Sequence, residues 1–170
     1  MKKTVTAYHG TDRVFDQFSL NAEKRSHGTK GGIWFSSCPC VAHSYTNHAA
    51  YNEKYYIKAL KHGDINGESI GNSSIIKCKL FFLNPLYFDA KGNHSGDLTG
   101  LRKVKPHEVC CGLIKPITMA DLFLDAVERG HDGVIVENVE DLGGFSFMIK
   151  EKGSALSTIY GVVSPEQIVF

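Results

Sequence analysis

The feature that most constrains the fold is the spacing of glycine and proline, 17 and 5 residues respectively in a chain of 170. Between these breaks the apolar runs are short and rich in β-branched and aromatic residues, which is typical of β-strands. Strands are predicted at 4–8, 33–36, 75–82, 134–136, 145–149 and 157–163. We find no confident element in 89–116. The sequence therefore predicts an α+β fold with more strand than helix.

The clearest helix follows Thr118. Asp121 stands three residues after Thr118, as in a capping box, and Gly130 supplies a stop. An apolar stripe lies between them, made of Leu122, Phe123, Ala126 and Val127. A second helix is expected over 39–51, because Pro39 suits a first helical position and Ala42, Tyr45 and Ala49 follow at steps of three and four.

Length and composition favour one domain spanning residues 1–170. Hydrophobic residues make up 42% of the chain, and no run reaches the roughly 18 apolar residues of a membrane span. The start, Met1 to Val5, lacks the features of a signal peptide, so we expect a cytoplasmic protein with no membrane partner. The net charge of +1 gives no general attraction to nucleic acid. A basic segment at 101–107 leaves a local phosphate contact open, although a solvated loop is the favoured interpretation.

Five cysteines are expected to be reduced thiols, because their number is odd and two of them are adjacent. A zinc site built from the Cys-Pro-Cys and Cys-Cys pairs with His43 is disfavoured, since neither pair has the two-residue gap usual in structural zinc sites. We therefore expect no metal.

The residues best suited to chemistry are His9, which ends a strand and precedes Gly10, together with the only tryptophan, Trp34, and Tyr45. A histidine there can hydrogen-bond a ligand hydroxyl, and two aromatic rings can enclose a planar heterocycle. By residue type alone, however, a structural histidine, a core tryptophan and an aromatic residue on a helix face are the favoured interpretation.

The order of the motifs favours the functional interpretation. The segments "AYHGT" at 7–11 and "GGIWFS" at 31–36 are followed by Tyr45, eleven residues after Trp34. Later come "NPL" at 84–86, "GHDGVIVEN" at 130–138 and "VVSPEQIVF" at 162–170. Over nearly its whole length the chain resembles the ADP-ribosyltransferase superfamily, in particular the diphtheria-toxin and poly(ADP-ribose) polymerase branch and its small bacterial or phage members. The resemblance implies a split β-sandwich with few helices and NAD as the substrate.

The resemblance also implies roles for particular residues. His9 is expected to bind the adenosine-side ribose, Gly10 the nicotinamide amide through its backbone, and Trp34 and Tyr45 the two faces of the nicotinamide. The expected NAD-binding set is His9, Gly10, Thr11, Gly32, Trp34, Ser36 and Tyr45. The expected catalytic set is His9, Trp34, Tyr45 and Glu137.

The chain departs from the polymerase pattern at the acid. Polymerases carry a glutamate eight residues before the glutamine of the closing motif, and the corresponding residue here is Ile159. An isoleucine cannot accept a hydrogen bond. The acids considered as substitutes are Glu137, Glu140, Glu151 and Asp121.

The expected activity is mono-ADP-ribosyl transfer from NAD to a protein or nucleic acid, by an enzyme acting as a bacterial or phage toxin or in defence or counter-defence. A neutralising partner is compatible with that role. The alternatives are an inactive protein that binds NAD or a partner, and an NAD glycohydrolase.

Overall fold

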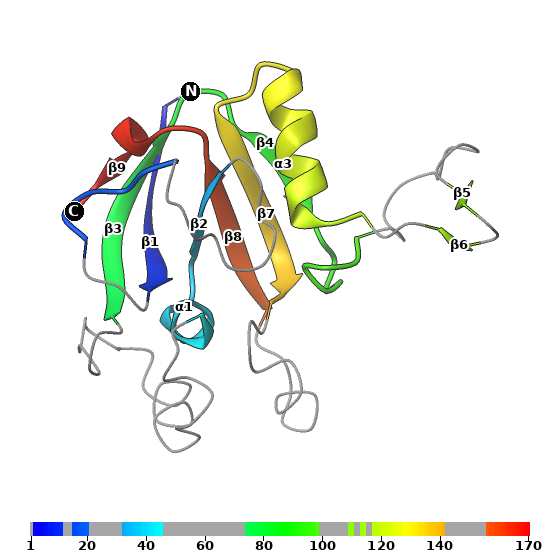
Figure 1. Cartoon of the computed structure of the whole chain (residues 1–170), viewed down its shortest axis with the longest axis horizontal. Coiled ribbons are helices and arrows are strands. Elements are labelled where there is room, and N and C mark those ends of the chain that lie inside the picture. Colours follow the sequence, from blue (N-terminus) through cyan, green and yellow to red (C-terminus); the bar gives the residue numbers. More distant parts are fainter. Residues whose placement is uncertain are drawn as a thin grey trace.

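The computed structural model describes residues 2–11, 15–20, 32–45, 74–98, 109–110, 113–114, 117–141 and 156–170. Their centre is a seven-stranded mixed sheet with the order β4-β7-β8-β2-β1-β3-β9 (Figure 1). The strands are β1 (Lys3–Thr11), β2 (Ile33–Ser36), β3 (Ser74–Phe82), β4 (Leu86–Asp89), β7 (Gly133–Glu140), β8 (Leu156–Val162) and β9 (Ile168–Val169). The other elements are α1 (Pro39–Ser44), α3 (Met119–Glu128), the 3-10 helix η6 (Pro165–Gln167) and a separate pair, β5 (Val109–Cys110) and β6 (Leu113–Ile114).

The sheet is nearly divided between β1 and β2. β1 pairs with β3 from Lys3 to Thr11, whereas it pairs with β2 only where Tyr8 faces Ser36. The two halves fold toward each other. One contact between them joins Lys3 on β1 to Tyr87 on β4, where the ammonium lies 4.7 Å from the ring centre. A buried cluster drawn from both halves fills the space between them; we call the surface of the sheet that faces it the inner face. It includes Ala7, Phe18, Phe35, Leu80, Phe82, Ile135, Tyr160 and Val162.

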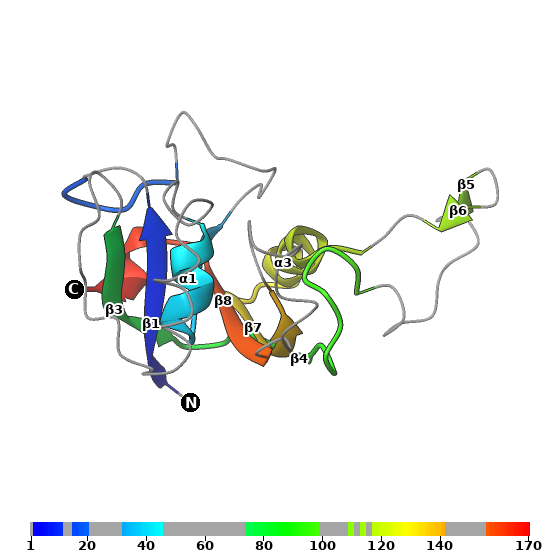
Figure 2. The ribbon, with the colours of Figure 1, turned by 90° about the horizontal axis from the view of Figure 1, so that it is seen from below.

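The opposite surface, the outer face, carries both described α-helices. Figure 2 shows α1 beside β1 and α3 beside β7. Phe123 and Ala126 of α3 pack with Val134, Val136 and other buried residues of the sheet, in a cluster that also contains Val41 of α1. Alternation of side chains along β2 and β8 explains the two clusters, since neighbouring residues of a strand point to opposite faces.

The expected capping box begins α3: the backbone N–H of Asp121 donates to Thr118 Oγ1, and the backbone N–H of Thr118 donates to the Asp121 carboxylate at 2.9 Å. The strands expected at 33–36 and 75–82 are also present, as are those at 134–136 and 157–163 with shifted ends. The described part is thus an α+β fold with more strand than helix.

Several boundaries differ from the prediction. The strand expected over 4–8, with its end at His9-Gly10-Thr11, begins at Lys3 and pairs through all three of these last residues, because β3 supplies hydrogen-bonding partners as far as Ser74. β4 was not foreseen; four residues are too short to show a clear period, and parallel pairing with β7 stabilises them. β5 and β6 lie within the segment in which no element was expected. The strand expected at 145–149 and residues 46–51 of the second helix lie outside the described residues.

Across the described ranges, neither α-helix has the length and apolar character that crossing a bilayer requires.

Candidate active site

The expected site begins where β1 and β2 separate. Continuing the register beyond the Tyr8–Ser36 pair would bring Gly10 opposite Trp34, but no such pair forms. Instead, His9 Nδ1 lies 2.8 Å from the backbone oxygen of Trp34. A carbonyl oxygen only accepts, so Nδ1 must carry the hydrogen and donate it. The imidazole therefore joins the two halves of the sheet at the point where the backbone ladder stops.

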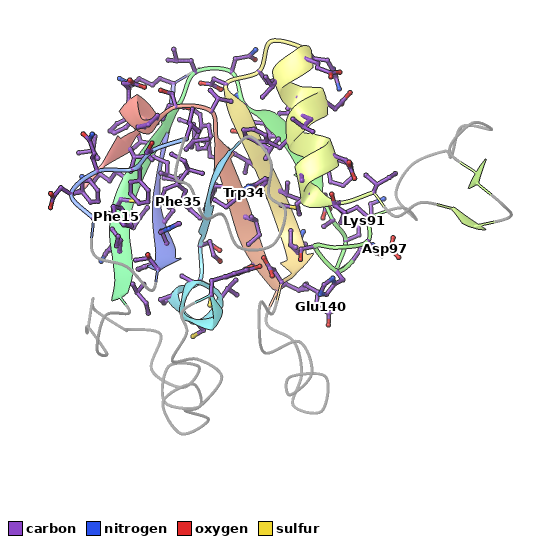
Figure 3. All side chains as sticks on the ribbon, viewed as in Figure 1. Phe15, Trp34, Phe35, Lys91, Asp97 and Glu140 are labelled. Carbon is purple, nitrogen blue, oxygen red and sulfur yellow. The ribbon has the colours of Figure 1, made fainter. Side chains whose placement is uncertain are left out.

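Aromatic rings surround His9 on the inner face. Its ring centre lies 5.0 Å from that of Phe18, 5.4 Å from Phe35 and 6.3 Å from Phe15. Figure 3 labels Phe15 and Phe35 of this group. Burial lowers the pKa of His9 below 6.5, although the hydrogen bond to Trp34 opposes the shift. His9 is therefore neutral near pH 7, and its Nε2 keeps a lone pair that can accept a hydrogen bond.

Trp34 uses its ring on the outer face. The ring centre lies 5.4 Å from that of Phe123 on α3. Gly161 on β8 lies directly opposite Trp34, and a Cβ there would stand 2.9 Å from the Phe123 ring and 3.0 Å from the Trp34 ring. A Cβ on Gly32 would likewise lie 2.8 Å from the Phe123 ring. Trp34 thus meets His9 through its backbone, while its indole packs against α3.

Three further residues of the expected NAD-binding set have structural contacts. Gly10 and Ser36 hold α1 against the sheet, and Thr11 is the last residue of β1. A Cβ on Gly10 would lie 1.7 Å from the carbonyl oxygen of Ala42, so α1 packs directly on the β1 backbone. Ser36 is buried, and its Oγ accepts a 3.0 Å hydrogen bond from the N–H of Cys38 just before the helix. Thr11 is buried at the end of β1, opposite Ser74.

Tyr45 follows α1 and meets a residue that sequence reasoning missed. Its hydroxyl donates to Asp141 Oδ1 at 2.7 Å, across 96 positions of the chain. Tyr45 is 51% exposed, whereas Asp141, directly after β7, is 5% exposed. The available signal was an acid following a buried strand, but spacing alone does not indicate that this strand ends beside Tyr45.

Ile159 is 5% exposed and lies opposite both Ser36 on β2 and Val136 on β7. It belongs to the outer-face cluster that includes Val41 and Phe123, with Trp34 packed against it. The position that holds the polymerase glutamate in the resemblance is thus filled by an apolar contact.

Three of the four acids considered as substitutes lie in the described part of the chain, and none of them is among the residues of the buried cluster that contains Ile159. Glu137 is exposed on β7 and lies near Tyr160, whose pKa is raised mainly by burial and to a smaller degree by the Glu137 charge. Asp121 accepts the capping hydrogen bonds of α3. Glu140 ends β7 (Figure 3), and Glu151 lies outside the described residues.

Two outer-face side chains have a buried polar atom without a hydrogen-bond partner in the described part of the chain, Trp34 Nε1 and Ser157 Oγ. Ser157 lies two residues before Ile159 on β8, so both side chains point to the same face. Unpaired buried groups are rare because each costs about 1–3 kcal/mol. The outer face around Ile159 thus contains two buried polar atoms whose hydrogen bonds are not made within the described part of the chain.

Cys38 and Cys40 flank Pro39 at the start of α1, between Trp34 and Tyr45. The Cys40 thiol and the backbone N–H groups of Val41 and Cys40 donate to Cys38 and lower its pKa to about 6, although burial opposes the shift. Cys40 is buried, and the hydrogen bond to Cys38 and burial raise its pKa. Cys38, Cys40 and Cys78 are free thiols, as expected, whereas the side chains of Cys110 and Cys111 are not described.

Among the described side chains, no three histidine, cysteine, aspartate or glutamate residues gather in a way that could hold a metal ion. Comparisons with protein-family models, with curated proteins and with solved structures find no match to this chain.

Proposed function

We propose that this chain transfers a single ADP-ribose unit from NAD to a macromolecular acceptor, a protein or a nucleic acid. The observation that carries the proposal is the hydrogen bond from His9 to the Trp34 carbonyl. The two segments on which the resemblance chiefly rests lie on neighbouring strands and meet at this bond. The bond and the lowered pKa leave His9 Nε2 as an acceptor, which suits a ribose hydroxyl as donor.

In the proposed reaction, the bond between the nicotinamide nitrogen and ribose C1′ breaks, and nicotinamide leaves as a neutral molecule with the bonding electron pair. An oxygen or nitrogen of the acceptor attacks C1′ and releases its proton to solvent. Because positive charge develops on the ribose, holding the substrate and stabilising that charge are the main tasks of the protein. Ile159 offers no carboxylate to orient a further ADP-ribose as acceptor, so a single transfer is expected.

A second candidate is a protein that binds NAD or a partner without chemistry. It is favoured by the burial of Ile159 in an apolar cluster. An NAD glycohydrolase differs from the transferase only in that water attacks C1′, so it would release nicotinamide without an acceptor. A role as a bacterial or phage toxin, or in defence or counter-defence, with a neutralising partner, belongs to the same proposal.

The test is incubation of the full chain with adenine-labelled NAD and a bacterial extract, followed by mass spectrometry with and without nuclease. We expect label on a macromolecule, lost in His9→Ala. His131→Ala is the matched control, since His131 Nδ1 also contacts a backbone carbonyl, that of Asn84 at 3.1 Å, in the turn before β7. Tight NAD binding without labelling would favour the inactive binder, and nicotinamide release without an acceptor would favour the glycohydrolase.

A further inference from the structure

Cys38 and Cys40 form a pair of thiols at the start of α1. The backbone N–H of Ala42 donates to the carbonyl oxygen of Cys38 at 3.1 Å, so Cys38 begins the first helical turn as its N-cap. Cα atoms two residues apart on a helix are separated by about 5.4 Å, which follows from the radius and rise of the helix. This separation falls within the range of about 4.4–6.8 Å that is usual for cysteines joined by a disulfide. The backbone therefore allows a bond between the two sulfurs.

The two side chains are already in contact. Cys40 belongs to a small buried cluster with Ala42 and Ile75, and Cys38 packs against this cluster. The Cys40 thiol donates a hydrogen bond to Cys38 Sγ, and the backbone N–H groups of Cys40 and Val41 donate to the same sulfur. The thiol, and to a smaller degree the two N–H groups, lower the pKa of Cys38 to about 6 against the effect of burial. Near pH 7 the pair is thus a thiolate in contact with a thiol.

The two sulfurs differ in their access to solvent. Cys38 is partly exposed, whereas Cys40 is 4% exposed. A small dissolved oxidant therefore reaches Cys38 first, with Cys40 held behind it. An accessible thiolate next to a second cysteine is the arrangement typical of cysteines that are oxidised reversibly. Cys78 on β3 lacks these features, because it is buried, its Sγ donates to the carbonyl oxygen of Ala7 at 3.8 Å, and burial raises its pKa to about 12.

We propose that Cys38 and Cys40 form a reversible oxidation site for hydroperoxides, with Cys38 as the attacking sulfur and Cys40 as the resolving one. The Cys38 sulfur attacks one oxygen of hydrogen peroxide and the O–O bond breaks, which leaves Cys38 as a sulfenic acid and releases hydroxide that takes a proton from solvent. The Cys40 sulfur then attacks the Cys38 sulfur and the S–O bond breaks. The departing hydroxide takes the Cys40 proton. Two cysteines are oxidised by two electrons in total, and the peroxide is reduced to two waters.

The product differs from the reduced pair at the start of α1. The Cys38 sulfur loses its negative charge, so the N–H groups of Cys40 and Val41 lose a charged acceptor. A disulfide across a single residue closes a small ring, and strained disulfides are readily reduced. A dithiol therefore restores the two thiols. The oxidation site does not depend on the proposed transferase activity.

The test treats the reduced full chain with hydrogen peroxide at pH 7, blocks the remaining thiols with N-ethylmaleimide and maps the peptides by mass spectrometry. We expect a disulfide between Cys38 and Cys40 that dithiothreitol reverses. The Cys38 thiol should be lost at least about tenfold faster than the Cys78 thiol. In Cys40→Ala, Cys38 should stop at the sulfenic acid, which dimedone traps. Cys78→Ala is the matched control and should leave the disulfide unchanged.

Cys38→Ser tests which sulfur attacks, because serine is a favoured N-cap and keeps the start of α1 while it removes the thiolate. We expect Cys40 to stay reduced in this variant, and its oxidation at the wild-type rate would reject Cys38 as the attacking sulfur. Loss of the Cys38 and Cys78 thiols at equal rates in the wild-type protein overturns the proposal. A Cys38 that stays reduced, or that pairs with any cysteine other than Cys40, also overturns it. These wild-type measurements decide the matter even if Cys40→Ala does not fold.

Discussion

Replacing Gly10 by alanine should disturb the site more than it disturbs the rest of the fold. The added Cβ would lie 1.7 Å from the carbonyl oxygen of Ala42, whereas real Cβ atoms essentially never approach another atom within 3.0 Å. The difference, 3.0 minus 1.7, requires α1 and β1 to separate by at least 1.3 Å. Forced overpacking of this kind typically costs about 1–3 kcal/mol. Because Cys38 and Tyr45 flank α1, the same shift displaces the segment between Trp34 and Tyr45.

Gly10→Ala is therefore expected to lower the free energy of unfolding by about 1–3 kcal/mol. It should also reduce NAD-dependent labelling by about a hundredfold, since a displacement of about 1 Å can have that effect on catalysis. Urea unfolding followed by circular dichroism measures the first quantity, and transfer of labelled ADP-ribose the second. Gly96→Ala is the control, because its Cβ would meet only the side chain of His94, at 3.2 Å. If Gly10→Ala matched the wild type in both assays, the direct packing of α1 on β1 would be refuted.

Three further predictions concern individual side chains. Burial lowers the pKa of His9 in the folded state below its ordinary 6.5, so at pH values below 6.5 the unfolded state binds more protons than the folded state. The free energy of unfolding should therefore fall as the pH is lowered through this range, by up to about 1.4 kcal/mol per pH unit. Urea unfolding between about pH 5.5 and about pH 7.5 should show this slope, reduced in His9→Gln; equal slopes would contradict it. Cys38, with a pKa of about 6, should be alkylated by iodoacetamide at pH 7 faster than Cys78, whose pKa burial raises to about 12. Peptide mass spectrometry can follow both rates, and equal rates would contradict the hydrogen bonds to Cys38 at the start of α1. Phe123→Ala should destabilise the protein by about 3–5 kcal/mol and shift the fluorescence of Trp34, whereas the exposed Leu124→Ala should do neither.

Local pattern was sufficient for most of the secondary structure. The Thr118–Asp121 capping box and most of the apolar stripe of α3 depend on neighbours three and four residues away, so they could be predicted. The capping box is confirmed, and of the stripe Leu122, Phe123 and Ala126 are buried, whereas Val127 is exposed. The continuation of β1 through His9, Gly10 and Thr11 could not, because a glycine after a short run indicates a turn until the partner strand β3 is known. β4 is stabilised by its parallel pairing with β7, which the sequence does not reveal.

The site shows the same division. Order and spacing selected His9, Trp34 and Tyr45, and β1 and β2 are indeed neighbours in the sheet. Residue type did not reveal that His9 and the Trp34 indole lie on opposite faces, joined through the Trp34 carbonyl. That arrangement follows from two things: side chains alternate between the two faces along each strand, and the backbone pairing of β1 with β2 stops at Tyr8 and Ser36.

The sequence by itself determined the short strands, the capped helix and the absence of a carboxylate at Ile159, because each depends on a residue's own chemistry or on its near neighbours. Only the tertiary structure decided that Asp141 lies against Tyr45, 96 positions away, because the contact depends on where α1 and β7 end. A hydrogen bond between residues so far apart is set by the packing of whole elements, and no local pattern records it.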